Sequence, residues 1–161
     1  MKPRIIEFTE KKIIGCKQMM NYATYNPVPL WQSFMPLKKE IKNTVSSDVF
    51  SLQQFPKGFW DQFNPLTHFE KWAAVEVSNF DTIPVSMYTL VIPSGCYAVF
   101  DYKGDGSDAP AFFDAIFSSW IPNSEYVVDN RPHFEILGEK YRKGDPNSEE
   151  EIWIPIRLKL I

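Results

Sequence analysis

The sequence contains few cysteines, and this limits the class of protein. Cys16 and Cys96 are the only two among 161 residues, too few for the disulfide framework of a small secreted domain. Neither cysteine stands at a metal-ligand spacing from His68 or His133, so we expect no metal site and no cofactor. The thiols are expected to be reduced and the protein cytoplasmic.

Long apolar runs and an excess of basic residues are missing as well. The chain has no run of 18 apolar residues, and its start, MKPRIIEFTEKK, lacks the apolar core of a signal peptide, so no membrane association is expected. Seventeen basic residues face 20 acidic ones, giving a net charge of -3. Because nucleic-acid-binding surfaces normally show a basic excess, we expect no direct contact with nucleic acid.

Aromatic residues, by contrast, are abundant. They make up 16% of the chain, with 13 Phe, 7 Tyr and 5 Trp. A globular core could absorb all of them, or some could line a cavity with flat, polarisable walls. Composition alone leaves both interpretations open.

The order of predicted elements occurs twice along the chain. Apolar and β-branched runs predict strands, and helical spacing of apolar residues predicts two helices. The first copy has strands at 3–8, 11–19, 48–55 and 69–77 with a helix at 30–41; the second has strands at 87–104, 133–137 and 150–160 with a helix at 105–120. Gly15-Cys16 matches Gly95-Cys96, and Trp72 matches Trp153, at an offset of about 80 residues.

This duplication predicts an α+β fold in a single domain, residues 1–161, with pseudo-repeats at about 1–82 and 83–161. Two β-α-β-β units related by a pseudo-twofold axis would form a curved antiparallel sheet with helices on one face. A ligand groove is then expected on the opposite face, lined by residues of both halves.

Several stretches resemble the GyrI-like family, the effector-binding domains of bacterial transcription activators. The resemblance lies in IPSGCYAVFDYKG, SSWIPNSEY, HFEIL and EEEIWIPI of the second half. In the first half, LWQSFMPLKKEI and FEKWAAVEV are similar to the standalone, integron-cassette type of effector-binding protein. The resemblance implies the same duplicated fold and the binding of hydrophobic, often cationic, small molecules.

The resemblance also bears on partners. Larger relatives carry this domain behind a DNA-binding domain, whereas this chain opens directly on the first effector-domain strand. A standalone module is therefore expected, with a hydrophobic or cationic small molecule as partner and a separate regulator protein as a further candidate. Some family members hydrolyse reactive small molecules, so the resemblance leaves catalysis open.

Glu135 in the segment RPHFEIL is the main candidate site residue. Strand alternation puts Phe134 and Ile136 on one face and His133, Glu135 and Leu137 on the other. From the residues alone, Glu135 is either a solvent-exposed ion-pair partner or a carboxylate in an apolar place. The resemblance implies the groove, where a ligand cation would offset the cost of removing the carboxylate from water.

The remaining candidates for the groove wall are mainly aromatic, because aromatic faces favour cations. They are Tyr97, Trp120, Leu137, Trp153, Trp72, Glu76, Phe34 and Trp31. For Trp120, Phe34 and Trp31 a place in the core is the competing interpretation, and for Glu76 a structural ion pair. Trp60 and Phe63, in the loop before residue 69, are candidates for a lid.

Three functions remain after these observations. The first is a standalone effector-binding protein linked to transcriptional regulation or drug sequestration. The second is a hydrolase that uses Glu135 as general acid or base, although no second catalytic residue stands at a telling spacing. The third is a protein-binding inhibitor that uses the aromatic groove as its contact surface.

Overall fold

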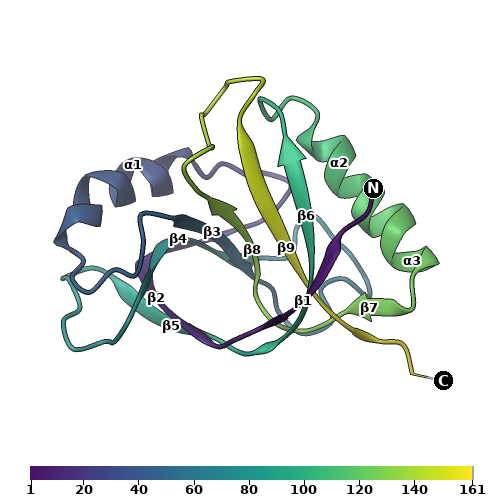
Figure 1. Ribbon diagram of the computed structural model, residues 1–161, viewed down its shortest axis with the longest axis horizontal. Helices are drawn as coiled ribbons and strands as arrows, with labels where there is room; N and C mark the ends of the chain where they lie inside the picture. The colour runs from purple at the N-terminus through teal and green to yellow at the C-terminus, as the bar shows by residue number, and fades with distance from the viewer. Residues whose placement is uncertain (161) are drawn as a thin grey trace.

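Nine strands form one antiparallel sheet in the computed structural model, which describes residues 1–160 (Figure 1). The strands are β1 (Arg4–Phe8), β2 (Lys11–Met20), β3 (Val49–Gln54), β4 (Phe69–Val77), β5 (Tyr88–Ile92), β6 (Gly95–Lys103), β7 (Tyr126–Val128), β8 (His133–Leu137) and β9 (Glu149–Leu158). The short strand β7, which pairs with β9, was not predicted from the sequence.

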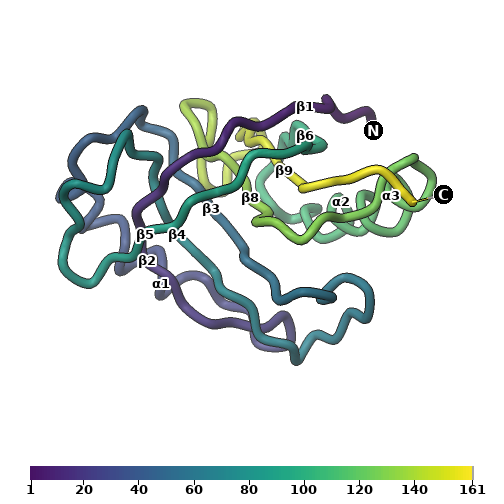
Figure 2. Tube along the Cα trace, turned by 90° about the horizontal axis from the view of Figure 1, so that it is seen from below, coloured from purple at the N-terminus to yellow at the C-terminus, as the bar shows by residue number. Residues whose placement is uncertain are grey.

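The strand order is symmetric about the central pair β3 and β8. It runs β1-β6-β9-β8-β3-β4-β2-β5, so β3, β4 and β2 of the first half correspond to β8, β9 and β6 of the second. The two edge strands are exchanged, since β5 extends the first half and β1 the second, as Figure 2 shows from below. The predicted α+β fold of duplicated units is confirmed, and the repeat boundary near residue 82 stays a prediction.

Trp72 and Trp153 occupy corresponding places in the two halves. Trp72 pairs with Leu52 of β3, and Trp153 pairs with Phe134 of β8. Each indole N–H donates to the glutamate two residues earlier, Glu70 at 3.1 Å and Glu151 at 3.2 Å. The repeated contact supports the internal duplication.

One helical segment accompanies each half of the sheet. Helix α1 (Val28–Leu37) carries Pro36 near its end and tightens into the 3-10 turn η1 (Lys38–Glu40). Helix α2 (Ala109–Ala115) continues as the π-helical turn η2 (Ile116–Trp120) and then as α3 (Ile121–Asn123). The segment extends through Pro122 to Asn123, past the end predicted at residue 120.

Asp108 stands at the N-cap position of α2, but its side chain does not cap the helix. The carboxylate instead accepts a hydrogen bond from the Tyr102 hydroxyl. None of the helices within residues 1–160 combines the length and apolar character needed to cross a membrane.

Both helical segments cover the same face of the sheet. Strand alternation directs Ala73 and Val75 of β4 toward the cluster beneath α1, and Ile152 and Ile154 of β9 toward the cluster beneath α2. The opposite face packs on itself around Phe8, Trp72, Tyr97, Phe134 and Trp153, among others. The exchanged strands contribute to this packing through Phe8 of β1 and Ile92 of β5.

The expected position of the groove is therefore wrong. The helix-free face is filled by its own aromatic core, and the large cavity includes residues of α2 in its wall. The cavity forms on the helix-bearing face because the two helical segments lie over opposite ends of the sheet (Figure 1). This leaves the central strands β3 and β8 as part of its floor.

Candidate functional site

A cavity of about 780 Å³ lies on the helix-bearing face, between α2–η2 and two loops of the first half. Its volume is in the range of sites for drug-sized ligands. It is lined by Tyr22, Tyr25, Gln53, Phe55, Trp60, Phe63, Ala109, Pro110, Phe113, Asp114, Phe117, Ser118, His133, Phe134, Glu135, Ile152, Trp153 and Ile154. The charged side chains in this wall are Glu135 and Asp114, and both are acidic.

Glu135 lies in the floor, near the centre of the sheet. It pairs in register with Ser51 of β3 and Ile152 of β9, and its carboxylate accepts a long hydrogen bond of 3.5 Å from the Gln53 amide. Burial raises the pKa of Glu135, whereas the positive charge of Lys71 and the bond from Gln53 lower it. The protein therefore compensates this carboxylate only in part.

Two further charged groups lie close to Glu135. Lys71 of β4 is only 2% exposed, and its ammonium donates a 2.7 Å hydrogen bond to the Ser51 hydroxyl. Burial raises the pKa of Glu150 in β9 to about 7, with a further rise from the negative charge of Glu135. A row of polar groups thus crosses four adjacent strands, from Lys71 through Ser51 and Glu135 to Glu150.

Aromatic rings form most of the cavity wall. The loop after β2 supplies Tyr22 and Tyr25, and the loop after β3 supplies Phe55, Trp60 and Phe63. Phe113 and Phe117 come from α2 and η2 on the other side. The indole N–H of Trp60 is buried and has no hydrogen-bond partner in the protein. Flat apolar rings around a carboxylate provide a surface suited to an aromatic cation.

His133 contributes an uncharged surface to the same floor. It is 4% exposed and packs edge-on against Phe55, with the ring centroids 4.8 Å apart. Burial, followed by the charge of Arg131, lowers the pKa of His133 to about 3. The imidazole is therefore neutral at ordinary pH and adds no positive charge to the cavity.

The comparison with known proteins identifies the domain. Residues 1–157 match the model of the GyrI-like small-molecule-binding domain. The chain belongs to this family. It is a GyrI-like small-molecule-binding domain related to transcription regulators.

Individual relatives support the same assignment. The chain is 27% identical over 157 residues to the transcriptional regulator BrlR of Pseudomonas aeruginosa, covering 97% of this chain and 56% of BrlR. The chain thus spans about half the length of that relative.

Two solved structures share the GyrI-like fold. SAV2435, solved with bound tetraphenylphosphonium, superposes with a TM-score of 0.68 at 18% identity and 98% and 94% coverage of the two chains. The Vibrio cholerae integron cassette protein VCH_CASS2 gives a TM-score of 0.65 at 17% identity, with 97% and 96% coverage.

Two of the nine sequence-predicted site residues, Glu135 and Trp153, border the GyrI-like cavity. Trp153 belongs to the floor of the cavity. Its ring, however, stacks on Phe134 in the core of the helix-free face, with the ring centroids 5.4 Å apart. The other seven lie outside the cavity wall, and we do not include them in the site proposed below.

Five of these seven are core or edge-of-core residues. Tyr97 and Trp72 lie in the helix-free face. The Tyr97 hydroxyl donates a hydrogen bond of 2.7 Å to the Pro132 carbonyl oxygen. Phe34, Trp31 and Leu137 belong to the cluster beneath α1.

The last two make specific contacts elsewhere. Trp120 stacks on Tyr126, with the ring planes 14° apart, within the cluster beneath α2. Glu76 forms an ion pair with Lys11 at 3.4 Å, the competing interpretation drawn from the sequence.

Sequence reasoning missed most of the aromatic wall and the buried lysine. The helical part of the aromatic wall could have been found from the sequence. One helix face carries four residues that line the cavity, at helical spacing: Pro110, Phe113, Asp114 and Phe117. Tyr22, Tyr25 and Phe55 come from loops, which have no periodicity to reveal their direction. Trp60 and Phe63, predicted as a possible lid, do line the cavity.

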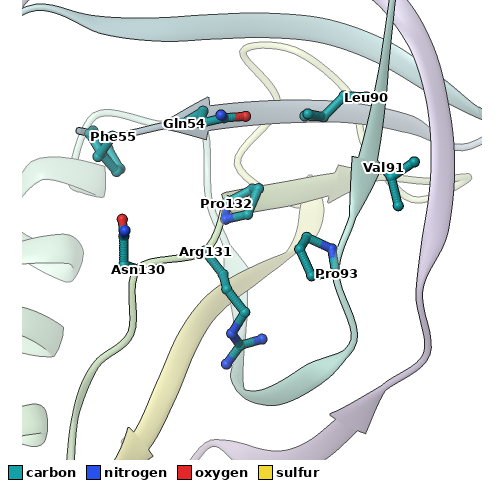
Figure 3. A pocket seen from close by; sticks show the side chains of 8 residues that line it. All are labelled: Gln54, Phe55, Leu90, Val91, Pro93, Asn130, Arg131 and Pro132. Atoms are coloured by element: carbon teal, nitrogen blue, oxygen red, sulfur yellow. The ribbon is translucent and has the colours of Figure 1, made fainter. Parts of the chain in front are cut away.

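A second hollow of about 230 Å³ lies between the end of β3, the β5–β6 turn and the segment before β8 (Figure 3). Arg131 is its charged lining residue, but the side chain runs away from Gln54 and Phe55. Its guanidinium donates to Asp129 at 2.8 Å and to the carbonyls of Cys96 and Ile156. These contacts tie strands together, so we assign this hollow no ligand.

The described residues contain no group of three His, Cys, Asp or Glu side chains placed to hold a metal ion. The chemistry that the large cavity offers is therefore an apolar, aromatic enclosure around a partly compensated carboxylate.

Proposed function

We propose that this GyrI-like domain binds hydrophobic organic cations in the aromatic cavity, with Glu135 as the recognising charge. The observation that carries the proposal is the position of Glu135 in the floor, beneath rings from both halves. A bound cation would offset the cost of the buried carboxylate, and each ring facing it would add about 0.5–2 kcal/mol. The phosphonium ligand of SAV2435, a protein of the same fold, is consistent with this class of ligand.

The biological setting follows from the family. BrlR is a transcriptional regulator, and this chain aligns with about half of it. We propose that the domain serves as an effector-binding module that either passes the presence of a ligand to a regulator or sequesters the ligand. Glu135 acts by electrostatic attraction in both cases, without a chemical step.

The test uses two ions of nearly the same shape and opposite charge, tetraphenylphosphonium and tetraphenylborate. Binding is followed by quenching of tryptophan fluorescence, because Trp60 and Trp153 border the cavity. We expect the wild type to bind the phosphonium at least about tenfold more tightly than the borate. Glu135→Gln should weaken phosphonium binding by about tenfold or more and reduce the preference between the two ions.

Glu76→Gln is the matched control, because Glu76 is also a partly buried carboxylate on a strand of this sheet but pairs with Lys11 outside the cavity. It should leave both affinities unchanged. Equal binding of the two ions by the wild type, or unchanged phosphonium affinity in a folded Glu135→Gln protein, would overturn the proposal.

A further inference from the structure

Lys71 is a buried cation close to the carboxylate that the proposed function assigns to ligand recognition. Its side chain is among the largest fully buried ones in the protein, and its ammonium donates to Ser51, the register partner of Glu135. Lysine is almost never fully buried without a charged partner. Burial lowers the pKa of Lys71, whereas the negative charges of Glu135 and Glu150 raise it and favour the ammonium form, which gives the site a positive charge of its own.

The surroundings of Lys71 explain how it is held. Glu135 of β8 and Glu150 of β9 attract it electrostatically over a longer range. Tyr25, from the loop after β2, lies with its ring centroid 5.8 Å from the ammonium. Ser51 and Gln53 of β3 are neutral, as is His133 of β8. The ammonium is thus fixed in place by one hydrogen bond, one aromatic ring and two longer-range attractions.

The charges of this group do not cancel. Glu135 and Glu150 carry two negative charges when ionised, and Lys71 carries one positive charge. Asp114 also lines the cavity, but it is exposed on α2 and its carboxylate accepts a hydrogen bond from Ser118, so water screens it. When all three groups are ionised, a ligand against Glu135 therefore lies close to one net negative charge, with Lys71 and Glu150 just outside the cavity wall.

We propose that Lys71 determines the charge specificity of the cavity: its fixed ammonium offsets one of the carboxylates of Glu135 and Glu150, so that singly charged cations bind in preference to doubly charged ones. This inference rests on the proposed cation-binding function. Without the ammonium, a dication against Glu135 would also be attracted by the nearby Glu150, with no opposing positive charge. With it, only one negative charge is left uncompensated, so the second charge of a dication has no partner to offset the cost of removing it from water.

The test compares tetraphenylphosphonium with a bis(triphenylphosphonium) dication joined by a short alkyl chain. Affinities are measured at pH 8, where Glu150, with a pKa of about 7, is largely ionised. Lys71→Met keeps the length of the side chain and removes its charge. We expect the affinity ratio of dication to monocation to rise by about tenfold in Lys71→Met, because the dication interacts with the removed charge through both of its centres.

Two variants serve as controls. Lys71→Arg retains the charge and should retain the wild-type ratio. Lys11→Met removes a lysine that pairs with Glu76 outside the cavity, and it should also leave the ratio unchanged. Where Lys71→Met does not fold, Glu150→Gln tests the same inference in the opposite direction, since it lowers the negative charge and should reduce dication affinity more than monocation affinity.

The outcomes separate the two proposals. If the wild type prefers the phosphonium to the borate but the dication ratio does not change in Lys71→Met or in Glu150→Gln, the role of Lys71 is overturned and cation binding stands. If the wild type does not prefer the phosphonium, the proposed function is overturned, and the role of Lys71 with it.

Discussion

Trp60 and Phe117 stack face to face in the cavity wall, with ring centroids 4.4 Å apart and planes only 7° from parallel. Trp60 belongs to the loop after β3 in the first half, and Phe117 to the π-helical turn η2 in the second. The stack therefore joins the two halves of the molecule in the cavity wall. Single π-helical turns are common at functional sites, and here the turn carries the ring that completes the wall.

Removing the Phe117 ring should weaken ligand binding. We expect Phe117→Ala to lower the affinity for tetraphenylphosphonium by about tenfold, since a lost ring contact costs about 0.5–2 kcal/mol and the Trp60 ring loses its support. Fluorescence titration measures the change. Trp120→Phe, in the same helical turn but stacked on Tyr126 outside the cavity, should leave the affinity unchanged. An unaltered affinity in Phe117→Ala would show that the wall makes no contact with the ligand.

Glu150 should make the folded state less stable as pH rises. The pKa of Glu150 is raised from 4.5 to about 7, so the folded protein retains a proton that the unfolded chain has already released. Its contribution to the free energy of unfolding is present below pH 4.5 and is lost as pH rises through about 7. Urea unfolding across this range should show a shallower decline in Glu150→Gln than in the wild type, and identical slopes would contradict the prediction.

His133 should act in the opposite sense. Its pKa falls from 6.5 to about 3 on folding, so its stabilising contribution is present above pH 6.5 and is lost as pH falls toward 3. His133→Gln should therefore unfold at a lower pH than the wild type in an acid titration followed by circular dichroism. His68→Gln, which alters the exposed histidine in the loop before β4, should keep the wild-type midpoint. If His133→Gln unfolded at the same pH as the wild type, the proposed contribution of His133 to acid unfolding would be refuted.

Gly15 permits the close approach of β2 and β4. A Cβ atom at this position would lie 2.1 Å from the Ala73 carbonyl oxygen and 2.6 Å from Ala74, both of which are part of the buried sheet. Gly15→Ala should lower the free energy of unfolding by about 2 kcal/mol or more, because the backbone of β4 would have to move. Chemical denaturation measures this loss. In Gly138→Ala the new Cβ would meet only the end of the Asp48 side chain at 3.2 Å, so a smaller effect is expected.

The sequence was sufficient to predict the elements other than β7, and their duplication, because alternation, helical spacing and repeated order are local patterns. It correctly placed His133, Glu135 and Leu137 on one face of β8. The same alternation holds in β6, where Tyr97 and Ala98 face opposite sides of the sheet. These relationships follow from strand geometry alone.

The sequence was not sufficient to say which face of the sheet holds the cavity. Alternation is the same whichever side the helices cover, so the groove, and Glu135 with it, was expected on the helix-free face. The aromatic residues of that face, Tyr97 among them, were taken for a ligand surface although they form a core. Lys71 was missed for a related reason. Its ammonium lies 5.8 Å from the centroid of the Tyr25 ring, which comes from a loop about 45 residues earlier in the chain, and no local pattern records that contact.

The exchanged edge strands have a consequence for how the protein forms. β2 obtains its outer neighbour from residues 88–92 and β6 obtains its own from residues 4–8, so each half is completed by a segment of the other. A half expressed by itself would expose the backbone groups of β2 or β6 along an open edge, where further chains can pair. The chain resembles an intertwined dimer joined into one polypeptide, and its two halves are expected to fold and unfold together rather than one after the other.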